Sequence, residues 1–196
     1  VNGLSLWLDA SDLSTADSSW FDKSGNNNHA TKNGSPEVLE KGLNKLSVMK
    51  YSGANGQYHS FDRISDIRTV FAVVKYNAGY WYLLGDTGSY DFHGNGVGAI
   101  FHSGYAHNSI KNGSVLKVNG SNYSLYGPWP REFAVISLRT SGNVRANNFS
   151  NDRNYGGRTA NGELGELLVF NTALSDANMQ EVQDYLDYKW GFMGVN

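Results

Sequence analysis

The chain has 196 residues, a formal net charge of −2 and no cysteine, and 17% of its side chains are charged. These values exclude disulfides, thiol catalysis and the basic surface with which proteins bind nucleic acid or an anionic membrane. A length of 196 residues suits one domain, which we expect over residues 1–196. We expect no membrane insertion, because no apolar run approaches the ~18 residues of a membrane span.

The first 76 residues show the patterns of short strands joined by turns. Alternating leucines predict a strand at residues 4–8, with Leu4, Leu6 and Leu8 inward. The turn that follows Trp20 contains Asp22 and His29, whose side chains we expect to bond the nearby backbone. Further strands are predicted at residues 43–51 and 58–61 and in the apolar run 69–75, which is typical of a central strand.

The middle of the chain is richer in glycine and aromatic residues. Alternation predicts short strands at residues 90–93 and 99–102, and two Asn-Gly pairs predict a three-stranded meander over residues 108–126. Residues 133–138 have the composition of a buried strand. We interpret the long polar segment 141–160 as a surface excursion.

The last fifth of the chain predicts a strand at residues 164–170, then a turn and one amphipathic helix. Ser175 suits the N-cap, and Gly191 suits the left-handed position that ends a helix. The apolar stripe of this helix contains Met179, Val182, Tyr185, Leu186 and Trp190. We expect the stripe to pack on the sheet, and the strands at residues 4–8 and 164–170 to be antiparallel neighbours.

Segments at both ends carry a family resemblance. Residues 162–176 (GELGELLVFNTALSD) resemble the closing segment of concanavalin A-like, laminin-G-type jelly-roll domains, and residues 6–12 (LWLDASD) and 20–31 (WFDKSGNNNHAT) resemble their opening. The resemblance implies an all-β, two-sheet antiparallel jelly-roll β-sandwich with one C-terminal amphipathic helix. We count eleven to thirteen strands at sandwich spacing. The family includes lectins, adhesins, modules of carbohydrate enzymes, and phage and virion surface proteins, which implies an extracellular, cell-surface or virion-surface location.

Catalysis finds little support in the sequence. A retaining glycosidase needs two carboxylates about 5–5.5 Å apart. Strict alternation puts the one acidic pair of a predicted strand, Glu163 and Glu166, on opposite faces, and we interpret Glu166 as a structural acid. Serine hydrolysis would need a nucleophile elbow, which the sequence lacks. We therefore expect no enzymatic activity.

Metal binding is compatible with several of these side chains. Zinc would use Asp91, His93, His102 and His107, although their spacing is not that of a tight zinc site. Calcium would use loop oxygens such as those of Asp86, and the resemblance implies a calcium ion at the rim of some relatives.

A binding surface is the remaining chemistry, because aromatic rings cover the apolar faces of sugars while Asn, Asp and His bond the hydroxyl groups. If residues 90–93 form a strand, Asp91 and His93 share its outward face. The candidate ligand-binding residues lie within 28 positions and are Tyr80, Trp81, Tyr82, Asp86, Tyr90, Asp91, His93, Asn95, His102, Tyr105 and His107.

The sequence thus favours a non-catalytic carbohydrate-binding or adhesion domain with a glycan or polysaccharide as partner, within a larger parent protein or assembly. The alternative is a structural or decoration module of a phage or virus particle or of a modular surface protein. A polysaccharide hydrolase or lyase is third. An accessible aromatic groove would favour the first, and a flat apolar patch the second.

Overall fold

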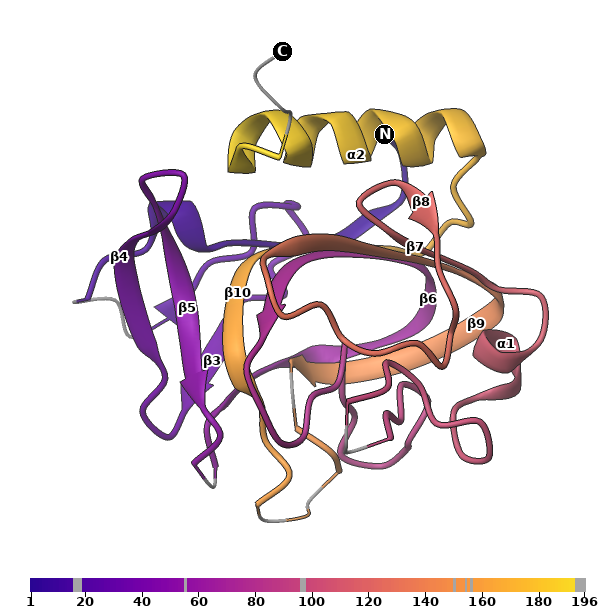
Figure 1. Ribbon diagram of the computed structural model, residues 1–196, viewed down its shortest axis with the longest axis horizontal. Coiled ribbons are helices and arrows are strands. Elements are labelled where there is room, and N and C mark those ends of the chain that lie inside the picture. The colour runs from indigo at the N-terminus through magenta and orange to yellow at the C-terminus, as the bar shows by residue number, and fades with distance from the viewer. Residues whose placement is uncertain are drawn as a thin grey trace.

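One antiparallel sheet runs through most of the chain, and a C-terminal helix lies across one of its faces (Figure 1). The computed structural model describes residues 1–15, 19–54, 56–95, 98–149, 151–153, 155 and 157–192. The strands are β1 (Leu4–Asp9), β2 (Ser19–Trp20), β3 (Ala30–Asn33), β4 (Glu37–Leu43), β5 (Leu46–Ser52), β6 (Tyr58–Tyr76), β7 (Val115–Val118), β8 (Ser121–Asn122), β9 (Ala134–Phe149) and β10 (Asn161–Phe170). The helices are a 3₁₀ turn at Ala10–Asp12, α1 (Asn108–Lys111) and α2 (Asp176–Trp190).

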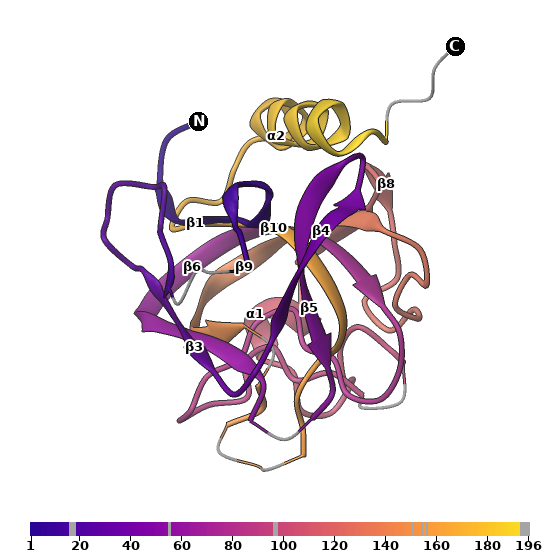
Figure 2. The ribbon, with the colours of Figure 1, turned by 90° about the vertical axis from the view of Figure 1, so that its left-hand side faces the viewer.

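The strand order is β4-β5-β10-β6-β9-β7-β8, with β1 beside β10 and the β2-β3 pair beside β6. The predicted antiparallel, mostly β fold with one long C-terminal helix is confirmed. The expected eleven to thirteen strands are instead ten in the described residues, all hydrogen-bonded into one sheet that curls without closing (Figures 1 and 2). The strands are fewer and the sheet is curled because β6 and β9 are long, with 19 and 16 residues, and shift register three times along their pairing. Such irregularities bend a strand pair without breaking it.

Strand β10 is the centre of this arrangement. Its first half pairs with β5, its second half pairs with β1, and β6 runs along its other edge. The predicted pairing of residues 4–8 with 164–170 is therefore confirmed, with Leu8 opposite Leu167. Leu6 and Leu8 point into the larger core as predicted, but a register shift after Leu4 turns that side chain toward the helix side.

The two faces of the sheet bury different cores. Val70, Ala72 and Val74 of β6 belong to the large core inside the curl, while Phe71 and Val73 belong to a second core beneath α2. The apolar run at residues 69–75 is thus a central strand, as predicted, and it is buried on both sides.

Helix α2 has the predicted ends and the predicted buried stripe. The Ser175 side chain accepts a hydrogen bond from the Asn178 N–H at 3.2 Å, and Gly191 ends the helix with φ +78°. Most of the stripe is buried, but Tyr185 stays 38% exposed. The buried members are Met179, Val182, Leu186 and Trp190.

A buried carboxylate joins α2 to the sheet. Glu166 is 0% exposed, and its Oε1 accepts from the Trp7 indole at 2.6 Å and the Tyr185 hydroxyl at 2.8 Å. Its Oε2 accepts from the Trp190 indole at 2.7 Å and lies 2.9 Å from the Lys189 ammonium. Burial, followed by the Glu166 charge, raises the pKa of Tyr185 well above its ordinary value. Glu166 is a structural acid, as predicted.

The prediction that Glu163 and Glu166 lie on opposite faces of the strand is wrong. A bulge at Gly165 interrupts the alternation, so Leu164 and Leu167 share the inner core and both glutamates lie on the helix side of β10. The two glutamates nevertheless have different partners, because Glu163 accepts from the Asn77 amide at 3.0 Å and Glu166 accepts from Trp7, Tyr185 and Trp190.

The turn after β2 is structural, as predicted. The Asp22 carboxylate accepts from the backbone N–H groups of Trp7 at 2.8 Å, Ser24 at 2.9 Å and Asn28 at 3.0 Å. His29 Nδ1 accepts from the Asp22 N–H at 3.0 Å. Neither α-helix of the described residues has the length and apolar composition that a membrane-spanning helix requires.

Several predictions for the middle of the chain are wrong. Residues 90–93 form a turn and residues 99–102 no regular strand, because their backbone bonds run to loops. The expected meander is a short helix, α1, followed by the β7–β8 hairpin, since His107 caps the helix by accepting from the Ser109 N–H. The first part of the expected excursion at residues 141–160 is instead strand, because β9 continues to Phe149.

Candidate functional site

Two loops meet at the end of the molecule opposite α2 (Figure 1). The first contains the described residues 77–95 and 98–107, and the second contains the described residues 151–153, 155 and 157–160. Gly85 joins them to the sheet, because its N–H donates to the Asn148 carbonyl at 2.9 Å and its carbonyl accepts from the Asn148 N–H at 3.1 Å. A side chain at Gly85 would meet the Asn151 carbonyl oxygen at 1.9 Å. Only glycine permits this approach, which holds the two loops together.

His93 lies at the centre of the rings that the first loop supplies. Its imidazole centroid is 5.9 Å from the Tyr82 ring, 6.4 Å from Tyr90 and 5.7 Å from both His102 and Tyr105. His102 Nδ1 accepts from the Gly104 and Tyr105 N–H groups, which shapes the turn that carries Tyr105. The rings at the rim remain open, since Tyr90 is 50% and Tyr105 60% exposed.

The second loop contributes a carboxylate held between two guanidinium groups. Asp152 is 4% exposed, and it accepts from Arg153 Nε at 2.9 Å, Arg153 Nη2 at 3.0 Å and Arg158 Nη1 at 2.9 Å. Burial alone would raise the pKa of the Asp152 carboxyl, but His93, Arg153 and Arg158 lower it by more, so this pKa lies well below its ordinary value. Arg153 is held with φ +53°, a conformation that non-glycine residues rarely adopt.

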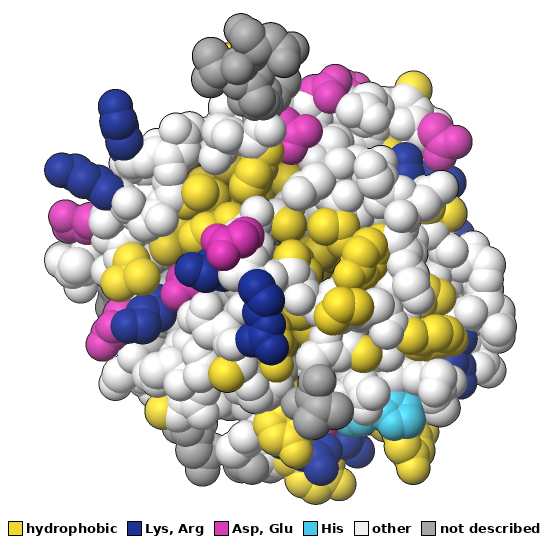
Figure 3. Space-filling model, viewed as in Figure 1, with side chains coloured by type: hydrophobic (Ala, Val, Ile, Leu, Met, Phe, Trp, Pro, Cys, Tyr) yellow, Lys and Arg dark blue, Asp and Glu magenta, His cyan; other side chains and the backbone are white. Residues whose placement is uncertain are grey.

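The guanidinium groups also lie over aromatic rings. Arg153 is 4.4 Å from the Tyr155 ring centroid and 5.5 Å from that of Tyr90, and Arg158 is 4.7 Å from that of Tyr155 and 5.5 Å from that of Tyr80. These cation–π contacts connect the two loops across a hollow. We call this hollow the tyrosine–arginine pocket; its volume is about 350 Å³, and it is lined by Tyr90, His93, Tyr105, Arg153, Tyr155 and Arg158. Histidine, basic and hydrophobic side chains gather at this end in Figure 3.

Three predicted binding residues line the tyrosine–arginine pocket, namely Tyr90, His93 and Tyr105. Three more predicted residues pack near these lining residues, namely Tyr80, Tyr82 and His102. Tyr80 stacks on Tyr82 at 6.4 Å with nearly parallel planes, and His102 packs 4.6 Å from Tyr105.

The other predicted residues have different places. Trp81 is 1% exposed and belongs to the inner core, because it points away from its neighbours Tyr80 and Tyr82. Asp86 is 2% exposed and forms a two-bond ion pair with Arg63, at 2.7 and 3.1 Å. Asn95 is exposed, and its N–H donates to the Ala99 carbonyl.

Asp91 and His107 face a second hollow of about 450 Å³, whose lining also includes Tyr90, Arg145 and Asn143. The Asp91 carboxylate accepts from the Arg145 N–H at 2.9 Å. The idea that Asp91 and His93 share one strand face is therefore wrong, because the turn aims them into different hollows on either side of Tyr90.

Metal binding by these residues gains no support. Among the residues that the structure describes, no three His, Asp or Glu side chains lie close enough together to hold a metal ion. Asp86, the calcium candidate, already has both carboxylate oxygens bonded to Arg63, and the Gly88 N–H donates to one of them at 2.7 Å.

Asp152, Arg153, Tyr155 and Arg158 are site residues that the sequence interpretation missed. They lie in the segment that was assigned to a polar surface excursion. A signal was nevertheless present, because this stretch sets a tyrosine among glycines, as residues 79–107 do, and adds two arginines.

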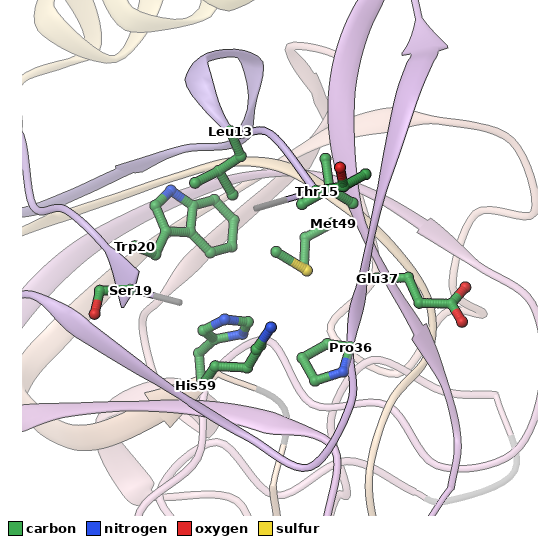
Figure 4. A pocket seen from close by; sticks show the side chains of 10 residues that line it. Leu13, Thr15, Ser19, Trp20, Pro36, Glu37, Met49 and His59 are labelled. Carbon is green, nitrogen blue, oxygen red and sulfur yellow. The ribbon is translucent and has the colours of Figure 1, made fainter. Parts of the chain in front are cut away.

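A more enclosed hollow of about 310 Å³ lies between the β4–β5 hairpin and the β2–β3 segment. Figure 4 shows Trp20, Met49 and His59 around it, with the Glu37 carboxylate pointing away. Trp20 and His59 are each 2% exposed, so their ring faces are packed inside rather than open to a ligand. His59 Nδ1 bonds the Tyr51 hydroxyl at 2.8 Å, which gives this hollow a structural character.

His59 predicts a loss of stability in acid. Burial, and to a lesser extent the charge of Lys32, lowers the pKa of His59 to about 4. The unfolded chain takes up a proton below about pH 6.5, whereas the folded one does not until about pH 4. Between these values the unfolded state binds more protons, so the free energy of unfolding should fall by about 3 kcal/mol as the pH drops through the window. Urea unfolding at pH 7, 5.5 and 4 should show a steeper fall for wild type than for His59→Gln, and equal slopes would contradict the prediction.

No protein-family model, curated protein or solved structure matches the chain.

Proposed function

We propose that the chain is a non-catalytic glycan-binding domain and that its ligand occupies the tyrosine–arginine pocket. The observation that carries this proposal is a hollow of about 350 Å³ whose rim holds three open tyrosine rings. Tyr90, Tyr105 and Tyr155 are 50–60% exposed, and such rings suit the apolar faces of sugars. The hydroxyl, imidazole and guanidinium groups between them suit sugar hydroxyls.

Binding fits these residues better than hydrolysis does. A glycosidase needs a carboxylic acid that holds a proton near neutral pH. The carboxylate that borders the described pocket, Asp152, has a pKa below its ordinary value and is bonded to Arg153 and Arg158. Glu166, on the far side of the sheet, is fully buried among its own partners.

Tyr90 lines both the tyrosine–arginine pocket and the neighbouring hollow that contains Asp91 and His107. A saccharide longer than one unit can therefore continue past this ring, which extends the proposal to an oligosaccharide or polysaccharide. The family resemblance supports the same function. We accordingly propose a concanavalin A-like architecture for the curled sheet, and a place for the domain in a larger extracellular or particle-surface protein.

Loss of ring stacking provides the test. In NMR titrations with an oligosaccharide selected on a glycan array, Tyr105→Ala and Tyr90→Ala should each weaken binding about two- to twelvefold, the range that one stacked ring contributes. Tyr188→Ala is the matched control, since Tyr188 is 77% exposed on α2. Repeating the array with EDTA tests calcium. Equal affinity for Tyr105→Ala and wild type, or chemical shifts confined to the α2 side, would contradict the proposal.

A further inference from the structure

We propose that the ligand of the tyrosine–arginine pocket is an acidic saccharide, whose carboxylate or sulfate group is held by Arg158. This inference rests on the proposed function and specifies its substrate class. It is supported by the charge of the pocket, whereas the aromatic rings support sugar binding in general.

The pocket carries more positive than negative charge. Among the residues that the structure describes, its lining contains Arg153 and Arg158 and no carboxylate, and Asp152 is the carboxylate bonded to both arginines. Two guanidinium charges against one carboxylate leave about one positive charge unpaired at the described pocket. The whole chain has a net charge of −2, so this excess is local and is not part of a generally basic surface.

The two arginines are held differently. Arg153 directs both Nε and Nη2 to Asp152, which is the two-bond arrangement that a guanidinium makes with a carboxylate. The bond of Arg158 to Asp152 uses Nη1, and a guanidinium has five N–H donors. Arg153 therefore positions Asp152, and Asp152 in turn positions Arg158, whose remaining donors can meet an anion.

The surroundings of Arg158 favour an anion over a neutral hydroxyl. Tyr80 and Tyr155 lie beside its guanidinium group, and its side chain is only 35% exposed. A partly desolvated cation interacts more strongly with an opposite charge than a fully hydrated one does. The bound sugar would stack on the open rings of Tyr105 and Tyr90 while its acidic group reaches Arg158.

The experiment compares ligands that differ only in charge. Isothermal titration of the full chain with trigalacturonate and with its methyl ester tests a carboxylate, and a sulfated disaccharide with its unsulfated counterpart tests a sulfate. We expect the acidic member of at least one pair to bind about tenfold or more tightly, as one charge-assisted hydrogen bond provides. The preference should decrease as the salt concentration rises.

Variants then assign the effect to Arg158. Arg158→Gln should abolish the preference for the acidic ligand, so that the acidic and the neutral member of each pair bind the variant with equal affinity. Arg158→Lys should keep part of the preference, because it keeps the charge but loses the planar fork. Arg139→Gln is the matched control, since Arg139 pairs with Asp176 at α2. Melting curves check that each variant is folded.

The outcomes separate the two proposals. Equal binding of charged and neutral partners in both pairs would overturn the acidic-ligand inference and leave glycan binding intact. An unchanged preference in folded Arg158→Gln would also overturn it. If no saccharide binds in any arm, the proposed function itself fails. Should Arg158→Gln not fold, the wild-type comparison of acid with ester still decides.

Discussion

Replacing Glu166 with alanine should lower the free energy of unfolding by about 3–5 kcal/mol, the range observed when one partner of a buried ion pair is removed. The carboxylate is fully buried, and its two oxygens accept from Trp7, Tyr185 and Trp190. Alanine would leave two indole N–H groups and a hydroxyl without acceptors, and each such group costs about 1–3 kcal/mol. Lys189 keeps its pairing with Asp9 at 2.6 Å, which limits the loss.

A control variant distinguishes the destabilisation by Glu166→Ala from the effect of removing any glutamate. Glu37→Ala is the control, because Glu37 forms an exposed pair with Lys50 at 3.7 Å, and such pairs contribute about 0–1 kcal/mol. The destabilisation by Glu166→Gln should lie between those of Glu166→Ala and Glu37→Ala. The glutamine amide keeps one acceptor oxygen, but its NH₂ group faces other hydrogen-bond donors. Urea unfolding followed by tryptophan fluorescence measures all three. If Glu166→Ala and Glu37→Ala proved equally stable, the buried network would have no energetic role.

Leu186→Ala should cost about 2–5 kcal/mol, because it removes a fully enclosed side chain from the core between α2 and the sheet. Leu186 is 0% exposed and belongs to the same cluster as Phe71 of β6 and Phe170 of β10. The helix is thereby part of the cooperative fold, and its contacts connect three segments of the chain. Thermal and urea unfolding should both report the loss.

Tyr188→Ala, two positions further along the same helix, is the matched control for Leu186→Ala. Tyr188 is 77% exposed, so its removal should change stability by less than about 0.5 kcal/mol. Comparable destabilisation by the two changes would contradict a packing role specific to Leu186, because alanine has the highest helix propensity and cannot weaken the helix in that way. An unaltered melting temperature after deletion of residues 175–196 would show that α2 is an accessory to the sheet.

The fold could be predicted where it depends on local periodicity. The alternation at residues 4–8, the apolar run 69–75 and the helical stripe on α2 each correspond to an observed element. The curl of the sheet could not be predicted in this way, because it depends on bulges such as that at Gly165, which are decided by packing against Trp190 and Val73. One inserted residue reverses every later inference about faces.

The candidate site was predictable in part, for a different reason. Tyr90, His93 and Tyr105 stood out because open aromatic and imidazole side chains are unusual among glycines. Their partners Arg153 and Arg158 come from a segment about fifty residues further along the chain, and the contact that unites the two depends on the close approach at Gly85. Asp86 looked like a ligand because its partner, Arg63, lies on β6, where the sequence shows no sign of the pairing.

The divided pairing of β10 has a consequence for biosynthesis. The first strand pairs with the second half of β10, so β1 leaves the ribosome almost a whole chain length before its partner is made. β5 and β6 are also synthesised before β10, with which both of them pair. Contacts this distant in sequence slow folding, and until residue 170 is translated the nascent chain presents open strand edges to its neighbours, which is the condition under which β-rich chains associate wrongly.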